Sequence, residues 1–133
     1  MSDCVFCRLD NLELIAENNL ALAFYDGCPI NEGHTLIIPR RHVETYFDAT
    51  PEEHAAIISL VFEVKNYLQK KYSPDGYNIG ANVGQAAGQT VFHFHIHIIP
   101  RYRGDVADPK GGIRKVISHR HSIHGSSCRK RFS

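Results

Sequence analysis

The stretch HFHIHIIPR, residues 93–101, alternates histidine with apolar side chains and then reaches a proline. Because successive side chains of a β-strand point to opposite faces, the alternation predicts a strand over residues 91–99 that Pro100 ends. Each face then carries one kind of side chain: His93, His95 and His97 on one side, and Phe94, Ile96 and Ile98 on the side of the core. The strand therefore presents a row of three imidazoles.

Three imidazoles on one face have three possible explanations. They can form a solvated polar face, bind a metal ion, or carry out catalysis. Along a strand, the Cα atoms of His93 and His97 lie roughly 13 Å apart, so one ion can bind two neighbouring histidines but hardly all three. At least one imidazole is left for other chemistry. A histidine near neutral pH can act as nucleophile, base or acid.

The composition is that of an ordinary globular protein. The chain has 133 residues, 43% hydrophobic and 22% charged, with a net charge of +1. This charge gives no bulk electrostatic reason to expect binding to nucleic acid or to a membrane. The N-terminus shows no secretory signal, and the longest apolar run, residues 55–62, is far too short to span a bilayer. We therefore expect a soluble, cytoplasmic protein whose four cysteines are reduced.

The rest of the chain predicts an α+β domain with a mainly antiparallel sheet. The most secure element is a helix from Pro51 to about Tyr72, with Thr50 as N-cap and Glu53 completing a capping box. Further strands are expected at residues 20–25, 34–38 and 77–83. Residues 118–133 are polar, basic and without periodicity, which predicts a flexible C-terminal tail.

The loop GQAAGQT, residues 84–90, directly precedes the histidine strand. Its glycines allow backbone N–H groups to approach an anion, and its amide and hydroxyl side chains can donate hydrogen bonds. It lacks both the GK[ST] of a P-loop and the GxGxxG of a dinucleotide fold, so on its own it is weak evidence. A donor-rich loop beside an imidazole face nevertheless suggests covalent phosphoryl or nucleotidyl transfer.

Three segments together resemble the histidine triad (HIT) family: AGQTVFHFHIHIIPR at 87–101, GHTLIIPRRH at 33–42 and FYDGCP at 24–29. The resemblance covers roughly residues 1–117, which we expect to form a single domain. It implies an antiparallel sheet of about five strands with one long helix and a short N-terminal helix. It also implies a homodimer that pairs through a continuous sheet.

The resemblance implies a nucleotide hydrolase that cleaves at the α-phosphate of purine nucleoside phosphoramidates or dinucleoside polyphosphates. In this chain His95 corresponds to the residue that attacks the phosphate and forms a nucleotidyl–histidine intermediate. His97 corresponds to its phosphate-side partner, and His34 to a fourth histidine that orients another imidazole. The residues that correspond to the family's site for AMP-containing nucleotides, besides His95 and His97, are Asp26, Gly27, Asn82, Gly88, Gln89 and Thr90.

A subset of the family also holds a structural zinc ion through an N-terminal C-x-x-C and two histidines. The corresponding residues are Cys4, Cys7, His42 and His93. Four such ligands with no open position are typical of a structural zinc site, and the reaction itself requires no metal. The alternative is a pair of free thiols near the N-terminus.

Two other functions remain open at this point. A small dimeric domain that binds purine nucleotides can serve as a binding or scaffold protein whose turnover is incidental. A metalloenzyme that uses the histidine face is the third hypothesis.

Overall fold

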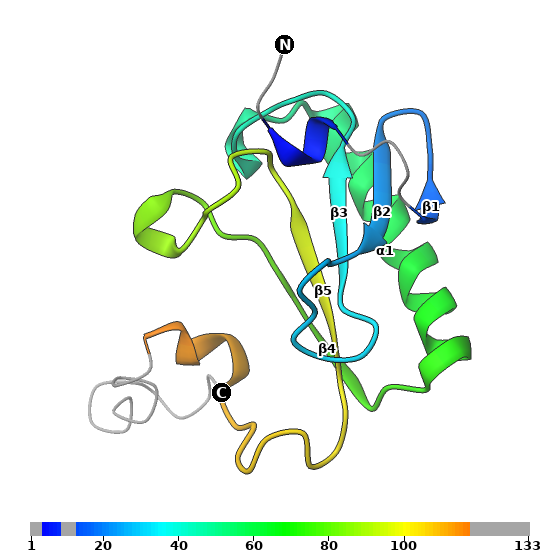
Figure 1. The fold of residues 1–133 in the computed structure, drawn as a ribbon, viewed down its shortest axis with the longest axis vertical. Helices are drawn as coiled ribbons and strands as arrows, with labels where there is room; N and C mark the ends of the chain where they lie inside the picture. The colour runs from blue at the N-terminus through cyan, green and yellow to red at the C-terminus, as the bar shows by residue number, and fades with distance from the viewer. Residues whose placement is uncertain (1–3, 9–12, 118–133) are drawn as a thin grey trace. The chain divides into compact units, whose positions relative to one another are not determined.

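The computed structural model describes residues 4–8 and 13–117 (Figure 1). Contacts divide the chain into two compact units, residues 1–102 and 103–133. The described part of the second unit contains the short 3-10 helix η4, Gly112–Val116. The predicted domain boundary after Ile117 stays a prediction, and the tail predicted for 118–133 lies outside the described residues.

The first unit is built on one antiparallel sheet of five strands in the order β1-β2-β3-β5-β4. A single long helix, α1, packs on β1, β2 and β3. The predicted α+β fold is confirmed. The strands are β1 Leu14–Glu17, β2 Ala21–Tyr25, β3 Thr35–Pro39, β4 Gly76–Gly80 and β5 Ile96–Arg101.

Helix α1, Pro51–Tyr72, begins with the predicted capping box. The Thr50 hydroxyl accepts a hydrogen bond from the Glu53 amide at 3.1 Å, and the Glu53 carboxylate accepts one from the Thr50 amide at 2.9 Å. The helix ends at Ser73, whose left-handed backbone has φ 52°. Its buried apolar residues recur at three- and four-residue steps: Ile57, Leu60, Val64 and Leu68.

The two faces of the sheet are covered by different elements. The helix-side core joins α1 to Ala21, Ala23, Ile37 and Ile98, among others. The opposite face carries a smaller cluster of Phe24, Leu36 and Ile38, against which Phe6 and Leu22 pack. Phe6 belongs to η1, Val5–Cys7, a 3-10 helix that stands where the short N-terminal helix was predicted. Because His97 pairs with Leu36, its side chain lies on the face opposite α1.

The histidine strand β5 begins at Ile96 rather than at Val91 and continues through Pro100. The proline is tolerated because β5 pairs there only with β4, and the pairing with β3 has already ended at Ile98. The Pro100 carbonyl accepts a hydrogen bond from the Asn31 side chain at 3.0 Å on that unpaired side. His93 and His95 therefore lie on the irregular segment just before the strand, which bends at His93.

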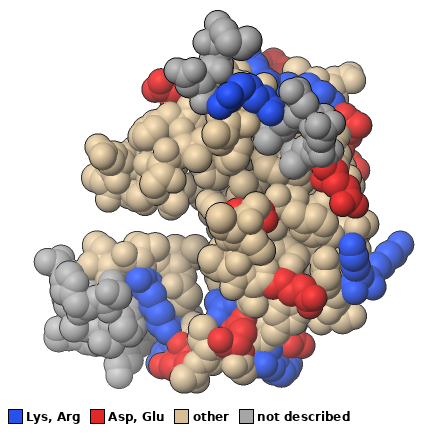
Figure 2. All heavy atoms as spheres, in the orientation of Figure 1, with Lys and Arg blue, Asp and Glu red and all other residues tan. Residues whose placement is uncertain are grey.

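Charged side chains of both signs are interspersed on the face shown in Figure 2, in keeping with a net charge of +1. Among the residues that the structure describes, no helix is long and apolar enough to cross a membrane.

Candidate active site and metal centre

Cys4, Cys7, His42 and His93 come together although they are far apart in the sequence. Their ligand atoms all lie within 4.8 Å of one another. The two cysteines flank the centre of η1, His42 follows β3, and His93 precedes β5. The Cys7 Sγ atom lies 3.3 Å from His42 Nδ1 and 3.4 Å from His93 Nδ1, and Cys4 Sγ lies 3.5 Å from His93 Nδ1.

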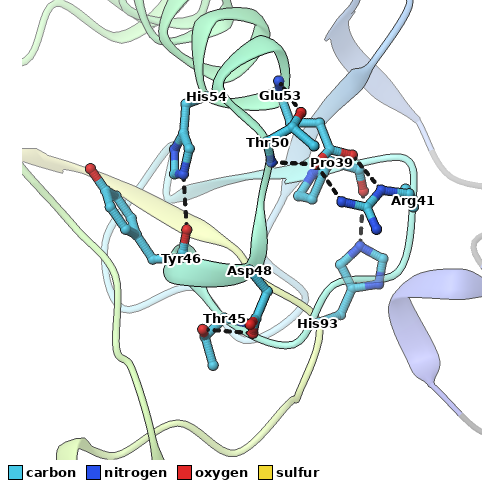
Figure 3. A network of polar contacts seen from close by, with 9 residues as sticks. All are labelled: Pro39, Arg41, Thr45, Tyr46, Asp48, Thr50, Glu53, His54 and His93. Carbon is cyan, nitrogen blue, oxygen red and sulfur yellow. Dashed lines mark hydrogen bonds and ion pairs between the residues drawn. The ribbon is translucent and has the colours of Figure 1, made fainter.

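These distances fit a tetrahedral zinc site. Bonds of about 2.3 Å to sulfur and about 2.05 Å to nitrogen at tetrahedral angles place S and N about 3.6 Å apart. The His93 ring is also oriented as a ligand, because its Nε2–H donates to the Pro39 carbonyl at 2.8 Å (Figure 3). The Nδ1 lone pair is left on the side of the two cysteine sulfurs. Burial lowers the pKa of His93 and so favours the neutral ring that a metal needs. The four residues therefore fit a structural zinc ion.

His95 has a defined tautomer. Its Nδ1 lies 2.8 Å from the His93 carbonyl, which can only accept, so Nδ1 carries the proton. The lone pair of the neutral ring is then on Nε2. Because His95 is only 9% exposed and its ring donor is fixed by the main chain, its Nε2 is oriented in a way that allows it to act as a nucleophile or a base.

A second chain of hydrogen bonds runs from His34 to His97. The Ile30 amide donates to His34 Nδ1 at 3.2 Å, so the His34 proton is on Nε2. That Nε2–H donates to His97 Nδ1 at 2.9 Å and lies 3.4 Å from the Asp26 carboxylate. The proton of a neutral His97 is therefore on its own Nε2, where it can be given to a reacting group.

Burial keeps the two histidines of this hydrogen-bonded chain neutral at physiological pH. It lowers the pKa of His34, against a raising effect of Asp26. The pKa of His97 is lowered to about 4, first by burial and then by His95 and His34, again against Asp26. An uncharged His97 with one proton can act as a hydrogen-bond donor or as an acid toward a strongly basic leaving group.

The ligand atoms of Asp26, His34 and His97 also lie close enough together to suggest a second metal site. The tautomer of His34 argues against it. With Nδ1 accepting from a backbone amide, the neutral ring has no lone pair left on Nε2 for a metal. In addition, 2.9 Å between the two ring nitrogens is a hydrogen-bond distance. The group is better explained as a hydrogen-bond relay than as a metalloenzyme centre.

The loop before the histidines contains the 3-10 helix η3, Gln85–Ala87, and is held by Gln89. The Gln89 side chain is buried and fully used: its oxygen accepts from the Gly84 amide at 2.8 Å, and its nitrogen donates to the carbonyls of Glu44 at 2.7 Å and Val91 at 3.1 Å. Gln89 therefore shapes the loop, and its side-chain hydrogens point into the protein. Direct contact of Gln89 with a nucleotide stays a prediction.

The remaining predicted nucleotide ligands, apart from Asp26, lie in exposed loops. Gly27, Asn82, Gly88 and Thr90 are all exposed. Gly88 has φ 93°, and a Cβ atom built on it would lie 3.9 Å from Asn82 Nδ2, so the structure brings these two predicted ligands together. Asp26 follows β2, and its other carboxylate oxygen accepts from the Cys28 amide at 2.8 Å.

Two residues that adjoin the site were not predicted from the sequence. Phe6, between the two cysteines, lies against His95 with ring centroids 5.1 Å apart. Arg41, beside His42, makes a two-pronged ion pair with Glu53 at the start of α1 (Figure 3). An aromatic residue inside C-x-x-C was the available signal for Phe6, whereas nothing local distinguishes Arg41 from Arg40.

Fold and site together define a small α+β protein with a histidine relay beside a Cys2His2 centre. The family model described as "HIT domain" matches residues 11–104, which is most of the chain. The chain belongs to the histidine triad (HIT) family.

Two relatives with named activities are similar to most of the chain. An adenylylsulfatase of Arabidopsis thaliana is 40% identical over 108 residues, which are 78% of this chain and 55% of that protein. An asymmetrical bis(5'-nucleosyl)-tetraphosphatase of Schizosaccharomyces pombe is 38% identical over 96 residues, which are 72% of this chain and 53% of that protein. The chain thus spans about half of each.

Among solved structures, a zinc-bound histidine triad family protein from Mycobacterium smegmatis has the same fold. Its TM-score is 0.71 at 30% sequence identity, and the match covers 92% of this chain and 96% of that one.

Proposed function

We propose that this protein is a nucleotide hydrolase that cleaves at the α-phosphate of purine nucleoside phosphoramidates or dinucleoside polyphosphates through a nucleotidyl–His95 intermediate. The observation that carries the proposal is the 2.8 Å hydrogen bond from His95 Nδ1 to the His93 carbonyl, which leaves the Nε2 lone pair free to attack. The two relatives named as nucleotide hydrolases support the general class of reaction.

In the first step, His95 Nε2 attacks the α-phosphorus and forms a P–N bond. The bond from phosphorus to the bridging nitrogen or oxygen of the leaving group breaks, and the leaving group takes the Nε2 proton of His97. As His97 gives up this proton, the hydrogen bond that His34 Nε2–H donates to His97 Nδ1 stabilises the electron-rich ring until the second step returns a proton to it.

In the second step, water attacks the same phosphorus atom. The P–N bond breaks and returns a neutral His95, while His97 Nε2 takes a proton from the water. The products are the nucleoside monophosphate and the free leaving group. Each histidine ends the cycle with the proton it had at the start, so no external acid or base is consumed.

For nucleotide binding, we propose that Asp26 accepts hydrogen bonds from the ribose hydroxyls beside Gly27. Asn82, Gly88 and Thr90 hold the phosphate, because their exposed donors lie on the loop that leads to His95. Gln89 contributes by fixing that loop to the Glu44 carbonyl. All three points are tested by the effect of substitutions on KM for AMP-containing substrates.

We further propose that Cys4, Cys7, His42 and His93 hold a structural zinc ion. A closed site of four ligands supplies folding free energy and orients its ligands, and it takes no part in the chemical step. Metal analysis is expected to find about one zinc per chain, and Cys4→Ser is expected to lose it. Full zinc content in Cys4→Ser would contradict the assignment.

Two further proposals concern the protein as a whole. A homodimer can form through β4, whose outer edge pairs with no other strand among residues 4–8 and 13–117, so a second copy could extend the sheet there. A cytoplasmic location agrees with the absence of a disulfide among the described cysteines. Size-exclusion chromatography with light scattering tests the first, and cell fractionation the second.

The decisive experiment uses His95→Ala and His95→Asn. Turnover is measured on adenosine phosphoramidate, diadenosine tetraphosphate and adenylyl sulfate, and AMP binding is measured in parallel. We expect the variants to lose turnover by at least about 10³-fold while AMP still binds, because the nucleophile contributes to chemistry far more than to ground-state affinity. Full activity in either variant would refute the mechanism.

The same experiment separates the other hypotheses. If the unmodified protein binds AMP tightly but cleaves none of the three substrates above background, a binding or scaffold protein is the better explanation. If chelation abolishes the chemical step while the fold is unchanged, the metalloenzyme explanation gains.

A further inference from the structure

Phe6 connects the metal centre to the proposed nucleophile. It is the middle residue of η1, between Cys4 and Cys7, and its ring lies edge-on against three others. The ring centroids are 5.1 Å from His95, 5.7 Å from Phe24 and 6.1 Å from His93, with interplanar angles of 85°, 72° and 70°. All three distances are those of favourable T-shaped pairs.

A helix as short as η1 cannot fix this ring by itself. It has three residues, and its own backbone bonds are Cys7 N–H to the Cys4 carbonyl at 3.1 Å and Arg8 N–H to the Val5 carbonyl at 3.3 Å. Such a turn is unstable alone, so tertiary contacts must hold it. The thiols on either side of Phe6 supply such contacts, since both lie within 3.5 Å of a histidine Nδ1 of the metal centre.

The His95 ring is held from three directions. The His93 carbonyl fixes its Nδ1–H, His97 packs beside it with ring centroids 5.1 Å apart, and Phe6 packs on it from η1. Two of these three supports come from the metal centre, because His93 is a ligand and Phe6 lies between two ligands. Loosening the metal centre would therefore release the nucleophile on two sides.

We propose that Phe6 is a positioning residue for His95 and that metal binding by the Cys4–Cys7 turn places it. The metal ion thereby sets the orientation of the nucleophile without touching substrate. This inference rests on the proposed hydrolase function of His95, and it concerns the packing of the protein's own side chains.

The first experiment exploits the absence of tryptophan from the chain. Phe6→Trp introduces one reporter at the contact, and its emission is followed while zinc is removed by a chelator and then restored. We expect emission to shift to longer wavelength on removal and to return with one equivalent of zinc, because the indole leaves and regains its partly buried contact with the neighbouring rings. In Phe6→Trp with Cys4→Ser, zinc should not restore it. Phe62→Trp, at an exposed position of α1, is the matched control and should not respond.

If metal analysis shows that the zinc has been removed and the emission of Phe6→Trp nevertheless stays constant, the proposal is overturned. If chelation also abolishes the circular dichroism of the sheet and helix, the shift reports unfolding, and the second experiment decides.

The second experiment compares Phe6→Leu with the unmodified protein, both fully zinc-loaded. Leucine keeps an apolar side chain but removes the aromatic pair with His95. We expect kcat and the rate of nucleotidyl transfer in a single turnover to fall about threefold to tenfold, with metal content unchanged and KM much less affected. An unchanged single-turnover rate would overturn the proposal.

The two proposals fail in different ways. Turnover that survives His95→Ala refutes the hydrolase mechanism whatever the tryptophan reports. Two results refute only the positioning role. One is an emission wavelength of Phe6→Trp that does not change with zinc, and the other is a single-turnover rate that Phe6→Leu leaves unchanged.

Discussion

Arg40 and Arg41 are adjacent, and each forms an ion pair with a glutamate. The two glutamates differ greatly in burial, so their substitution gives a matched test of which ion pair stabilises the loop that carries His42. Arg41 donates to the Glu53 carboxylate at 2.8 and 3.0 Å, and the Glu53 side chain is only 5% exposed (Figure 3). Arg40 donates to Glu17 at 2.7 Å, and the Glu17 side chain is 54% exposed. We therefore expect the loss of Glu53 to cost much more stability than the loss of Glu17.

The magnitude follows from the bonds each carboxylate accepts. Glu53 accepts two charge-assisted bonds from Arg41 and one from the Thr50 amide, which is part of the helix cap. Glu53→Ala is expected to lower the free energy of unfolding by about 2–4 kcal/mol. Glu53→Gln keeps an acceptor for Thr50 and should cost about half as much. Glu17→Ala is expected to cost less than about 1 kcal/mol.

The assay is urea unfolding followed by circular dichroism at fixed protein and zinc concentrations, since both affect apparent stability. The ion pair with Arg41 lowers the pKa of Glu53 below its ordinary value against a raising effect of desolvation, and the hydrogen bonds from Thr50 lower it further. Its stabilising effect is therefore present above the unfolded-state pKa and is lost as the pH falls through the lower folded-state pKa. Equal effects of Glu53→Ala and Glu17→Ala, or a Glu53 effect that persists in strong acid, would refute the reasoning.

Two further predictions concern the relay and the loop. The pKa of His97 is about 4 in the folded state, and the unfolded value is 6.5. Between these pH values the unfolded chain therefore binds more protons than the folded one. The free energy of unfolding should fall by up to about 3 kcal/mol as the pH drops through that window. The measurement uses Cys4→Ser, in which no metal is released on unfolding, and the free energy of unfolding of this variant should decrease as the pH falls. Adding His97→Gln should make this pH dependence less steep. An unchanged pH dependence would contradict the lowered pKa of His97. Gln89→Leu should raise KM for nucleotide at least about tenfold, because the Gly84 amide and the Glu44 carbonyl lose their partner. Thr90→Val, beside it, tests whether the hydroxyl alone matters, and an unchanged KM in Gln89→Leu would exclude its role in shaping the loop.

Elements with strong local signals were predicted well from the sequence. Helix α1 has a capping box, a proline at its first position and a regular apolar face, and it runs from Pro51 to Tyr72 as expected. The strands that were missed or misplaced depend on pairing. Strand β1, Leu14–Glu17, was not singled out from its sequence, and it forms against β2. Strand β5 begins where β3 and β4 can pair with it rather than where the alternation begins.

The site shows the same division between local and long-range information. The types of the residues proposed to react were predicted from the sequence, but the positions of their protons were not. The tautomers of His34 and His95 are set by the Ile30 amide and the His93 carbonyl, which are main-chain groups without a side-chain signature. The role of Gln89 was likewise hidden, because an amide before the histidines could face a phosphate or the protein interior.

The segment from Pro39, the last residue of β3, to Thr45, which precedes η2 (Tyr46–Asp48), explains why much of this organisation leaves no trace in the sequence. Its side chains reach the metal centre and α1, while its carbonyls reach the histidine segment and the phosphate loop. The contacts are Pro39 to the His93 ring, Arg41 to Glu53, His42 to Cys7, Val43 to the Phe94 amide and Glu44 to Gln89. Three of these five contacts use main-chain carbonyls and are therefore independent of side-chain identity. It follows that substitutions at the exposed Glu44 should leave its carbonyl contact in place, whereas a change in the path of the chain would disturb the proposed metal centre, His95 and the loop before the histidines together. Three side chains anchor this path: Arg41 on α1, His42 at the proposed metal centre and Val43 in the core, so we expect stability and chemistry to be coupled at these positions.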